Sequence, residues 1–464
     1  MDRLRRSSLF LNLFSVAGAA VLNRLIGLVT LGYAARVLGP ENYGLVGYGL
    51  SVAAYAGILV SPGLLTWGTR EVARDRAQAG KMVLLVTLTR LVLAFVAYAA
   101  LVVLAFGFLA ERSQRAIVLV CGLILFHTAL SADWVLNGLE LMRVPALLSV
   151  INAVVYAVAL LTLVRSPENV YIYALIRVPI GLILSGIVYG LLFKRVRVQL
   201  AWPGFREARQ ALLASLPLGL TMALVVILHY ANNLIVQAYL GMAVLGIFLA
   251  AYSLLELATQ LPGILATVFL PRLARCAAEA TLQARQEALL FARVHMVAAF
   301  FVAAFFLAEA PALIGIVYGV KYAAAVPYLR LMAFAIVFNY AICGYTNCLI
   351  SFSKDRVMLG VVTACTIVSV GGGFLLVPRM GALGAALVIT CIDLAGWLVS
   401  LPHYRRAIGS LQFRAWLLPA LGGAAIVCAS LLFRHIGWPA WARLPLSALA
   451  YAPFVLQDIR GALK

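Results

Sequence analysis

The most constraining feature of this chain is a series of unbroken apolar runs, each about 20 residues long, which is the length a helix needs to cross a bilayer. Only α-helices and closed barrels satisfy their backbone hydrogen bonds within hydrocarbon, and barrel strands would give alternating segments of about 10 residues. The 464 residues are 64% hydrophobic and 11% charged. The sequence therefore predicts an all-α polytopic membrane protein.

The apolar runs predict about fourteen transmembrane helices joined by short loops. The expected spans are 9–36, 44–68, 82–108, 115–138, 145–164, 170–192, 211–237, 243–270, 289–309, 326–352, 358–377, 382–404, 415–433 and 442–457. The first run resembles a signal peptide, but it continues past Arg24 to about Ala35 and is expected to be a retained helix. No loop is long enough to form a soluble domain with an active site of its own.

The basic residues alternate in density from loop to loop. Of the 36 Lys and Arg residues, 24 fall on the face that carries the termini and nine on the other. Because cytoplasmic loops carry an excess of Lys and Arg, both termini are expected in the cytoplasm. This loop pattern also explains the net charge of +20 without a nucleic-acid partner.

Three separated segments repeat at an offset of about 200 residues. Leu38-Gly39 recurs as Leu240-Gly241, Pro62-Gly63 as Pro262-Gly263, and Ala73-Arg74 as Ala274-Arg275. The offset contains an even number of predicted helices, so the repeat is parallel, a kind found in transporters whose substrate site lies between the halves. It predicts a six-helix lobe at 1–193, a basic cytoplasmic linker at 194–210, a second six-helix lobe at 211–406 and a terminal helix pair at 407–464.

Arg24 lies near the middle of the first expected span. A central Arg costs about 2.5 to 3.5 kcal/mol on insertion scales, so it needs a partner or a wet cavity. One interpretation is a structural ion pair with Glu256 or Asp393, which also lie within spans. The other is an anion site, because a guanidinium binds phosphate oxygens through two parallel hydrogen bonds.

Glu256 and Asp393 have two interpretations each. A desolvated carboxyl suits proton or cation coupling, whereas a satisfied buried pair would be structural. Glu256 corresponds through the repeat to Ala54, so it adds a charge to one half only.

Other polar groups within spans are candidates for binding sugar hydroxyls or for bonds between helices. They are Arg177 in the sixth span and His229, Asn232 and Asn233 in the seventh. Arg177 and Arg90 both lie close enough to a span end for the side chain to reach the interface, which favours structural roles for them.

No catalytic arrangement is evident. The chain has no Gly-rich phosphate loop followed by Lys-Ser/Thr, and its seven cysteines show no C-x-x-C spacing. No cofactor or metal site is expected, and transport is favoured over enzymatic activity.

Several stretches resemble bacterial polysaccharide flippases of the O-antigen type, which belong to the multidrug, oligosaccharidyl-lipid and polysaccharide exporter superfamily. The resemblance rests on Ala35–Gly44 (ARVLGPENYG), Arg70–Arg74 (REVAR), Asp133–Glu140 (DWVLNGLE) and the segment around Pro271-Arg272-Leu273. The span pattern extends it over the whole chain.

The resemblance implies a flippase that moves undecaprenyl-diphosphate-linked oligosaccharide from the cytoplasmic to the outer leaflet by alternating access. It implies a place in the bacterial cytoplasmic (inner) membrane, ion coupling through H+ or Na+, contact with membrane lipid, and a glycan polymerase and assembly machinery as partners. Such proteins have a cationic central cavity, and Arg24 is the residue of this chain that best matches it. No motif identifies Glu256 or Asp393 as coupling residues. The terminal helix pair is similar to that of peptidoglycan-precursor flippases, in which it supports the lipid tail.

Two alternatives stay open at this point. One is a multidrug or organic-cation antiporter of the same superfamily. Such a carrier is expected to have acidic residues in its cavity, so the basic Arg24 argues against it. The other is a membrane enzyme of glycan assembly, which would need clustered carboxylates or a long outer loop bearing Arg and His.

Overall fold

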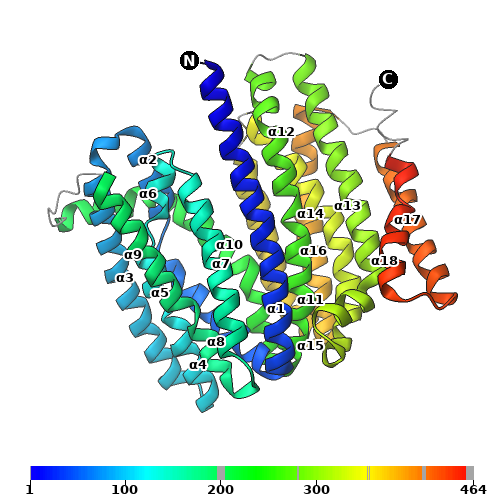
Figure 1. Cartoon of the computed structure of the whole chain (residues 1–464), viewed down its shortest axis with the longest axis horizontal. Helices are drawn as coiled ribbons and strands as arrows, with labels where there is room; N and C mark the ends of the chain where they lie inside the picture. Colours follow the sequence, from blue (N-terminus) through cyan, green and yellow to red (C-terminus); the bar gives the residue numbers. More distant parts are fainter. Residues whose placement is uncertain are drawn as a thin grey trace. The chain divides into compact units, whose positions relative to one another are not determined.

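The computed structural model describes residues 2–195, 204–278, 282–352, 354, 356–409 and 414–455, and every regular element in these ranges is a helix (Figure 1). The chain divides into two compact units, Met1–Gln237 (unit 1) and Ala238–Lys464 (unit 2). The predicted class, an all-α polytopic membrane protein, is confirmed. The lobe boundaries predicted near residues 193 and 211 stay a prediction.

Unit 1 is a bundle in which α1 contacts α3, α4 and α7. Its elements are α1 (Asp2–Val60), α2 (Leu64–Arg74), η1 (Arg76–Gln78), α3 (Ala79–Phe108), α4 (Arg112–Gly122), α5 (Ile124–Leu130), α6 (Asp133–Gly138), α7 (Arg143–Leu163), η2 (Pro167–Asn169), α8 (Val170–Leu175), α9 (Arg177–Arg195) and α10 (Phe205–Leu240), the last of which ends just beyond the unit boundary.

Unit 2 is organised around one central helix, α14, which contacts α11, α12, α13 and α16. Its elements are α11 (Met242–Thr259), α12 (Leu261–Ala278), α13 (Leu282–Val317), η3 (Val320–Ala325), α14 (Val326–Ser351), α15 (Arg356–Met380), α16 (Ala382–Ala407), α17 (Arg414–His435) and α18 (Ala440–Leu449). The terminal helices α17 and α18 both pack on α13.

Twelve helical segments within the described ranges are long and apolar enough to cross a membrane. The first of them, Gly18–Val60, covers most of the two predicted spans 9–36 and 44–68, because α1 breaks at Gly39, whose φ of 75° lies in the left-handed region that favours glycine. Without that break, 59 helical residues would extend about 88 Å, far beyond a hydrocarbon core of about 30 Å. The last predicted span, 442–457, coincides in part with the short helix α18 and ends outside the described residues.

The predicted repeat has a counterpart in backbone geometry. Gly39 precedes the second half of α1 with φ 75° and ψ 169°, and Gly241 precedes α11 with φ 82° and ψ 177°. Glycine reaches this conformation without the penalty that a Cβ imposes. The two matched positions therefore make the same kind of helix break.

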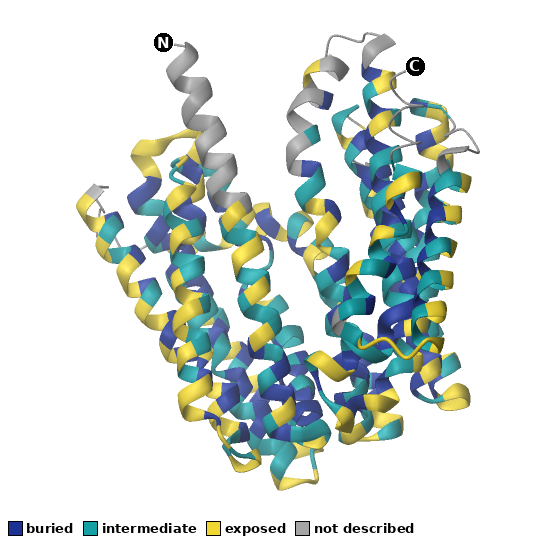
Figure 2. Cartoon of the chain, turned by 45° about the vertical axis from the view of Figure 1, so that its right-hand side comes forward, coloured by how far each residue is buried: buried dark blue, intermediate teal, exposed yellow. Residues whose placement is uncertain are grey.

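Buried residues gather inside each bundle, and exposed residues lie on its outer faces (Figure 2). On α3 the exposed side chains are themselves apolar, among them Val92, Phe95 and Val103 at 63%, 61% and 66% exposure. A helix face of this kind suits contact with lipid chains and not with water.

Candidate functional site

Arg24 lies on α1, where its side chain is half-buried and its Nη1 atom is fully buried. The residue before it is fixed against α7, because Asn23 Nδ2 donates to Ser149 Oγ at 2.9 Å. This bond sets the rotation of α1 at the level of Arg24. The ion pair between Arg24 in unit 1 and either Glu256 or Asp393 in unit 2 stays a prediction.

Arg177 begins α9, and its guanidinium carbon lies 4.8 Å from the centre of the Tyr156 ring on α7. The residue is exposed. A cation over an aromatic face gains about 0.5 to 1 kcal/mol at exposed sites. The Tyr156 ring therefore orients the Arg177 guanidinium.

The three polar residues predicted on α10 differ in environment. His229 is exposed, whereas Asn232 and Asn233 are buried at 1% and 4% exposure. Asn233 Nδ2 donates to Ser51 Oγ at 3.0 Å, and Ser51 Oγ donates to the Gly47 carbonyl at 2.7 Å. For Asn233 the structure thus favours the second of the two interpretations, a bond between α10 and α1. Both polar side-chain atoms of Asn232 are buried without a hydrogen bond to any described residue.

The two candidate coupling carboxylates lie on different helices of unit 2. Asp393 on α16 accepts a hydrogen bond of 3.2 Å from Asn339 Nδ2 on α14. Glu256 on α11 is half-buried, and its carboxylate pairs with no Lys or Arg of the described ranges. A half-buried acid without a basic partner is a suitable group for binding a proton or cation.

The Arg90 side chain on α3 was expected to reach the membrane interface, but in the structure it is buried. The residue is 1% exposed and donates to two backbone carbonyls, those of Thr128 and of Ser131, the latter at 3.1 Å. These carbonyls belong to the C-terminal end of α5, where the chain breaks before α6. Arg90 therefore satisfies a buried helix terminus, which apolar periodicity could not reveal.

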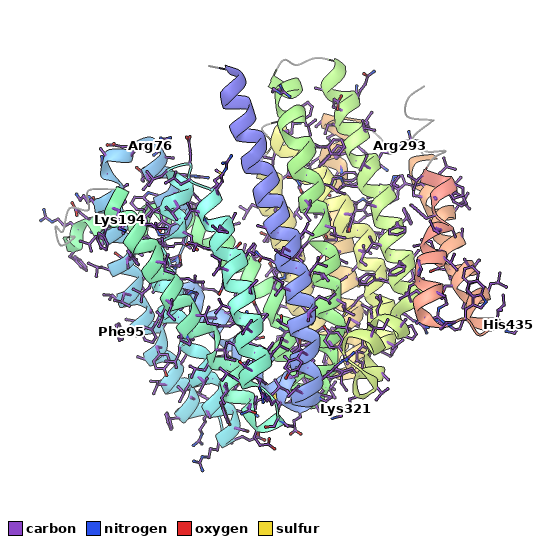
Figure 3. All side chains as sticks on the ribbon, in the orientation of Figure 1. Arg76, Phe95, Lys194, Arg293, Lys321 and His435 are labelled. Carbon is purple, nitrogen blue, oxygen red and sulfur yellow. The ribbon has the colours of Figure 1, made fainter. Side chains whose placement is uncertain are left out.

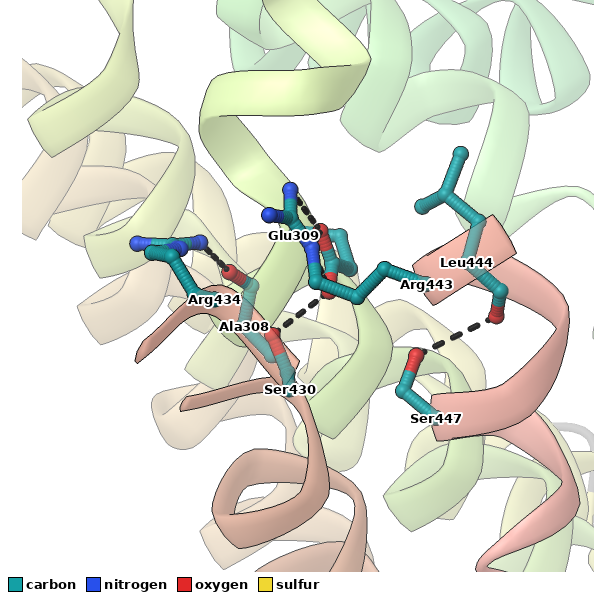
Figure 4. Close-up of polar contacts among 7 residues, drawn as sticks. All are labelled: Ala308, Glu309, Ser430, Arg434, Arg443, Leu444 and Ser447. Atoms are coloured by element: carbon teal, nitrogen blue, oxygen red, sulfur yellow. Dashed lines mark hydrogen bonds and ion pairs between the residues drawn. The ribbon is translucent and has the colours of Figure 1, made fainter. Parts of the chain in front are cut away.

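A second group that the sequence analysis missed is a buried ionic cluster on the terminal helix pair (Figure 4). Glu309 of α13 has no exposed surface, and its carboxylate receives Arg443 Nη2 at 3.0 Å, Arg443 Nε at 3.1 Å and Ser430 Oγ at 2.5 Å. Nearby, Arg434 Nη2 donates to the Ala308 carbonyl at 2.9 Å. In the sequence, the feature that could have indicated this cluster is Glu309 itself, a single acid at the end of the apolar run 289–309.

Two of the motifs that carry the family resemblance pack against each other in unit 1. A Cβ on Gly138 of α6 would lie 3.0 Å from the Cβ of Val72 on α2, and Thr69, just before the first of these motifs, donates through Oγ1 to the Trp134 carbonyl at 3.2 Å. Arg76 pairs with Glu140 at 2.7 Å on the surface. The motifs therefore build a close α2–α6 contact, which is a structural role.

In unit 1, two residues expected on the same face of the membrane lie toward the same end, and in unit 2, two residues expected on opposite faces lie at opposite ends. Arg76 and Lys194 lie toward one end of unit 1; in unit 2, Arg293 lies toward one end and Lys321 toward the other (Figure 3). Arg76, Lys194 and Arg293 were expected in the cytoplasm and Lys321 outside. This separation is what a bundle spanning a bilayer requires.

The fold defines a multi-pass, all-helical membrane protein. A family model described as "Polysaccharide biosynthesis protein" matches residues 9–277. This chain belongs to that family. A protein of Shigella dysenteriae named "Putative O-antigen transporter" is 25% identical over 280 residues, which cover 57% of this chain and 66%, a little under two thirds, of that protein.

Solved structures show the same fold. A structure titled "Lipid II flippase MurJ, inward closed conformation" aligns with a TM-score of 0.77 at 12% identity and covers 97% of this chain and 99% of that one. An inward-facing multidrug resistance transporter of the MATE family and MOP superfamily aligns at 0.66 and 18% identity, covering 84% and 95%. The names of these relatives describe transporters or flippases, and the likeness to the solved structures shows a shared fold.

Proposed function

We propose that this protein is a flippase that moves undecaprenyl-diphosphate-linked oligosaccharide from the cytoplasmic to the outer leaflet. The observation that carries the proposal is the match of residues 9–277 to the polysaccharide biosynthesis family. The named O-antigen transporter and the structural likeness to a lipid II flippase support it. Both names refer to glycans or lipid-linked precursors that a bilayer does not pass unaided.

Arg24 is assigned to the diphosphate. Its half-buried guanidinium on an apolar helix can form two parallel hydrogen bonds to phosphate oxygens, and charge-assisted bonds of this kind contribute about 1.5 to 3 kcal/mol. The polyprenyl tail stays in lipid throughout. The protein therefore lowers the cost of moving only the polar head group through hydrocarbon.

The mechanism proposed is alternating access by two lobes, coupled to inward movement of H+ or Na+. Glu256 and Asp393 are the coupling candidates, because each is a carboxylate within an apolar helix and neither pairs with a basic residue of the described ranges. An inside-negative potential, worth about 2.3 kcal/mol per charge per 100 mV, favours both the inward movement of the cation and the outward movement of the anionic head group.

Surface-glycan export in cells that depend on this protein tests the assignment of Arg24. Arg24→Ala should lower export at least about tenfold at equal protein level, since one charge-assisted contact is worth a factor of ten or more. Arg24→Lys should retain part of it, because an ammonium keeps the charge but not the fork of donors. Arg112→Ala, an exposed change at the start of α4, is the matched control and should export normally.

Wild-type export by a stably expressed Arg24→Ala variant would remove this residue from the mechanism. The same cells separate the alternatives. Loss of the protein should cause lipid-linked precursor to accumulate facing the cytoplasm, whereas loss of a polymerase would leave flipped precursor outside and loss of a drug exporter would leave surface glycan intact.

A further inference from the structure

Unit 2 contains a pocket of about 210 Å³ among α14, α16 and α17. Its lining residues are Tyr345, Trp397, Leu401, Tyr404, Arg405 and Trp416. None of them belongs to the candidate transport site described above. The combination of aromatic walls and one permanent cation suggests a ligand with an anionic group.

The aromatic walls are held in place by contacts of their own. Tyr345 and Tyr404 are 2% and 1% exposed and stack with ring centres 4.1 Å apart, and Tyr404 OH donates to the Ala288 carbonyl of α13 at 3.3 Å. Trp397 and Trp416 meet edge to face at 5.8 Å. The pocket is thus preformed, which lowers the entropy cost of binding.

Two groups can donate hydrogen bonds to a ligand. Arg405 is exposed, always charged, and makes no ion pair with a carboxylate in the part of the chain that the structure describes. The indole Nε1 of Trp397 is a donor only and is buried without a hydrogen bond of good geometry, and the Tyr345 side chain of the same pocket lies within its reach. A buried donor of this kind favours an acceptor-rich ligand.

The pocket lies at the end of unit 2 where basic residues gather. Arg285, near the start of α13, donates through Nε to the Ile408 carbonyl just beyond α16, which places Arg405 and Arg406 at the same end as Arg293 and away from Lys321 (Figure 3). Tryptophan and tyrosine side chains favour the head-group level of a bilayer, and basic pockets between helices on the cytoplasmic side bind anionic lipid head groups.

We propose that this pocket binds the phosphodiester head group of an anionic phospholipid from the surrounding bilayer. The volume is roughly seven times the ~30 Å³ that one water occupies in the liquid, enough for a phosphodiester but below the 300 to 1,000 Å³ of pockets for drug-sized ligands. Arg405 binds the phosphate oxygens, and Trp397 supplies a second donor. This assignment does not depend on the glycan substrate.

The test is native mass spectrometry of the purified full chain with phosphatidylglycerol or phosphatidylcholine of identical acyl chains. Wild-type protein should retain phosphatidylglycerol at least about tenfold more tightly. Arg405→Gln should lower that affinity about tenfold, and Trp397→Phe, which keeps a ring but removes the N–H donor, a few-fold. Arg406→Gln removes the same charge one residue away, outside the pocket, and should change it by less than about twofold.

Equal losses in Arg405→Gln and Arg406→Gln would show general attraction to charge, and equal retention of the two lipids would show no head-group recognition; either result overturns the proposal. Inorganic phosphate at millimolar concentration distinguishes the source of the anion. If phosphate alone displaces the lipid from wild-type protein, the pocket is a site for soluble phosphate esters. Matching melting temperatures of the variants exclude misfolding as the cause of a loss.

Discussion

At the scale of single residues, polar groups within the apolar helices of this chain serve two kinds of role. Arg90 and Asn233 have hydrogen-bond partners on neighbouring helix segments, and those partners explain them structurally. Glu256 has no basic partner, and Asn232 no hydrogen-bond partner, in the ranges that the structure describes. Substitution separates the two kinds, because a structural group changes stability first and a functional one changes transport first.

Arg90→Met is expected to lower the melting temperature of the purified protein. The change keeps the apolar stem of the side chain but leaves the Thr128 and Ser131 carbonyls without their shared donor, at about 1 to 3 kcal/mol for a buried acceptor. Arg90→Lys should restore part of the loss. An unchanged melting temperature in Arg90→Met, with Arg112→Met as the exposed control, would contradict a structural role.

Asn232→Leu is expected to leave the melting temperature unchanged or to raise it. Both polar atoms of this side chain are buried without a described partner, and an apolar replacement removes that desolvation cost. Export should be measured on the same variant. A stable protein that no longer exports glycan would indicate that the Asn232 amide contacts substrate or bound water, whereas a large loss of stability would mean that it has a structural partner.

At the scale of elements, the buried Glu309–Arg443 pair joins the terminal helices to α13. Two charges removed from water must be satisfied together, and here Arg443 and Ser430 both meet the Glu309 carboxylate (Figure 4). Tyr451 adds a bond of 2.8 Å from its hydroxyl to the Val297 carbonyl. The terminal pair is therefore fixed to unit 2 by polar contacts as well as by apolar packing.

Glu309→Gln should destabilise the protein by about 3 to 5 kcal/mol, because it leaves the buried Arg443 uncompensated. The double variant Glu309→Leu with Arg443→Met should recover most of that loss, since an apolar pair has no desolvation cost. Thermal unfolding of the single and double variants in detergent checks this. A double variant no more stable than Glu309→Gln would contradict the account of α17 and α18.

Hydropathy predicted most elements of this fold, and the reasons are physical. A span must hold about 20 apolar residues, so the runs at 82–108 and 382–404 coincide closely with α3 and α16. The break between α5 and α6 was not predicted, since Arg90 stabilises it from another helix and a run of apolar residues carries no sign of that contact. Likewise, Arg443 lies far from Glu309 in sequence, and only the fold brings them together.

At the scale of the whole molecule, the sequence supplied candidates for the site but could not assign them. The bond from Asn233 to Ser51 favours a structural role for that amide, whereas Arg177, which lies over the Tyr156 ring, stays a candidate for either role. Hydropathy and charge show that a polar residue lies within the membrane, but the contacts that decide its role are tertiary. Transport itself is a property of the full chain in a sealed bilayer.

Ion coupling is tested in proteoliposomes with an imposed H+ or Na+ gradient. If Glu256 and Asp393 couple transport, Glu256→Gln or Asp393→Asn should abolish the response of flipping to the gradient while leaving gradient-free flipping in place, because each change removes the charge and keeps the shape. Wild-type flipping that ignores both gradients would exclude the two residues as coupling sites.

The central claim is that this protein moves a lipid-linked oligosaccharide between leaflets, and leaflet accessibility measures it directly. Undecaprenyl-diphosphate-linked oligosaccharide is placed in the leaflet that corresponds to the cytoplasmic face of reconstituted protein, and its appearance in the other leaflet is followed with a membrane-impermeant glycosidase or lectin. Wild-type protein and Arg112→Ala should transfer the glycan, and Arg24→Ala should do so at least about tenfold more slowly. Transfer no faster than in protein-free vesicles, by wild-type protein shown to be folded, would contradict the account.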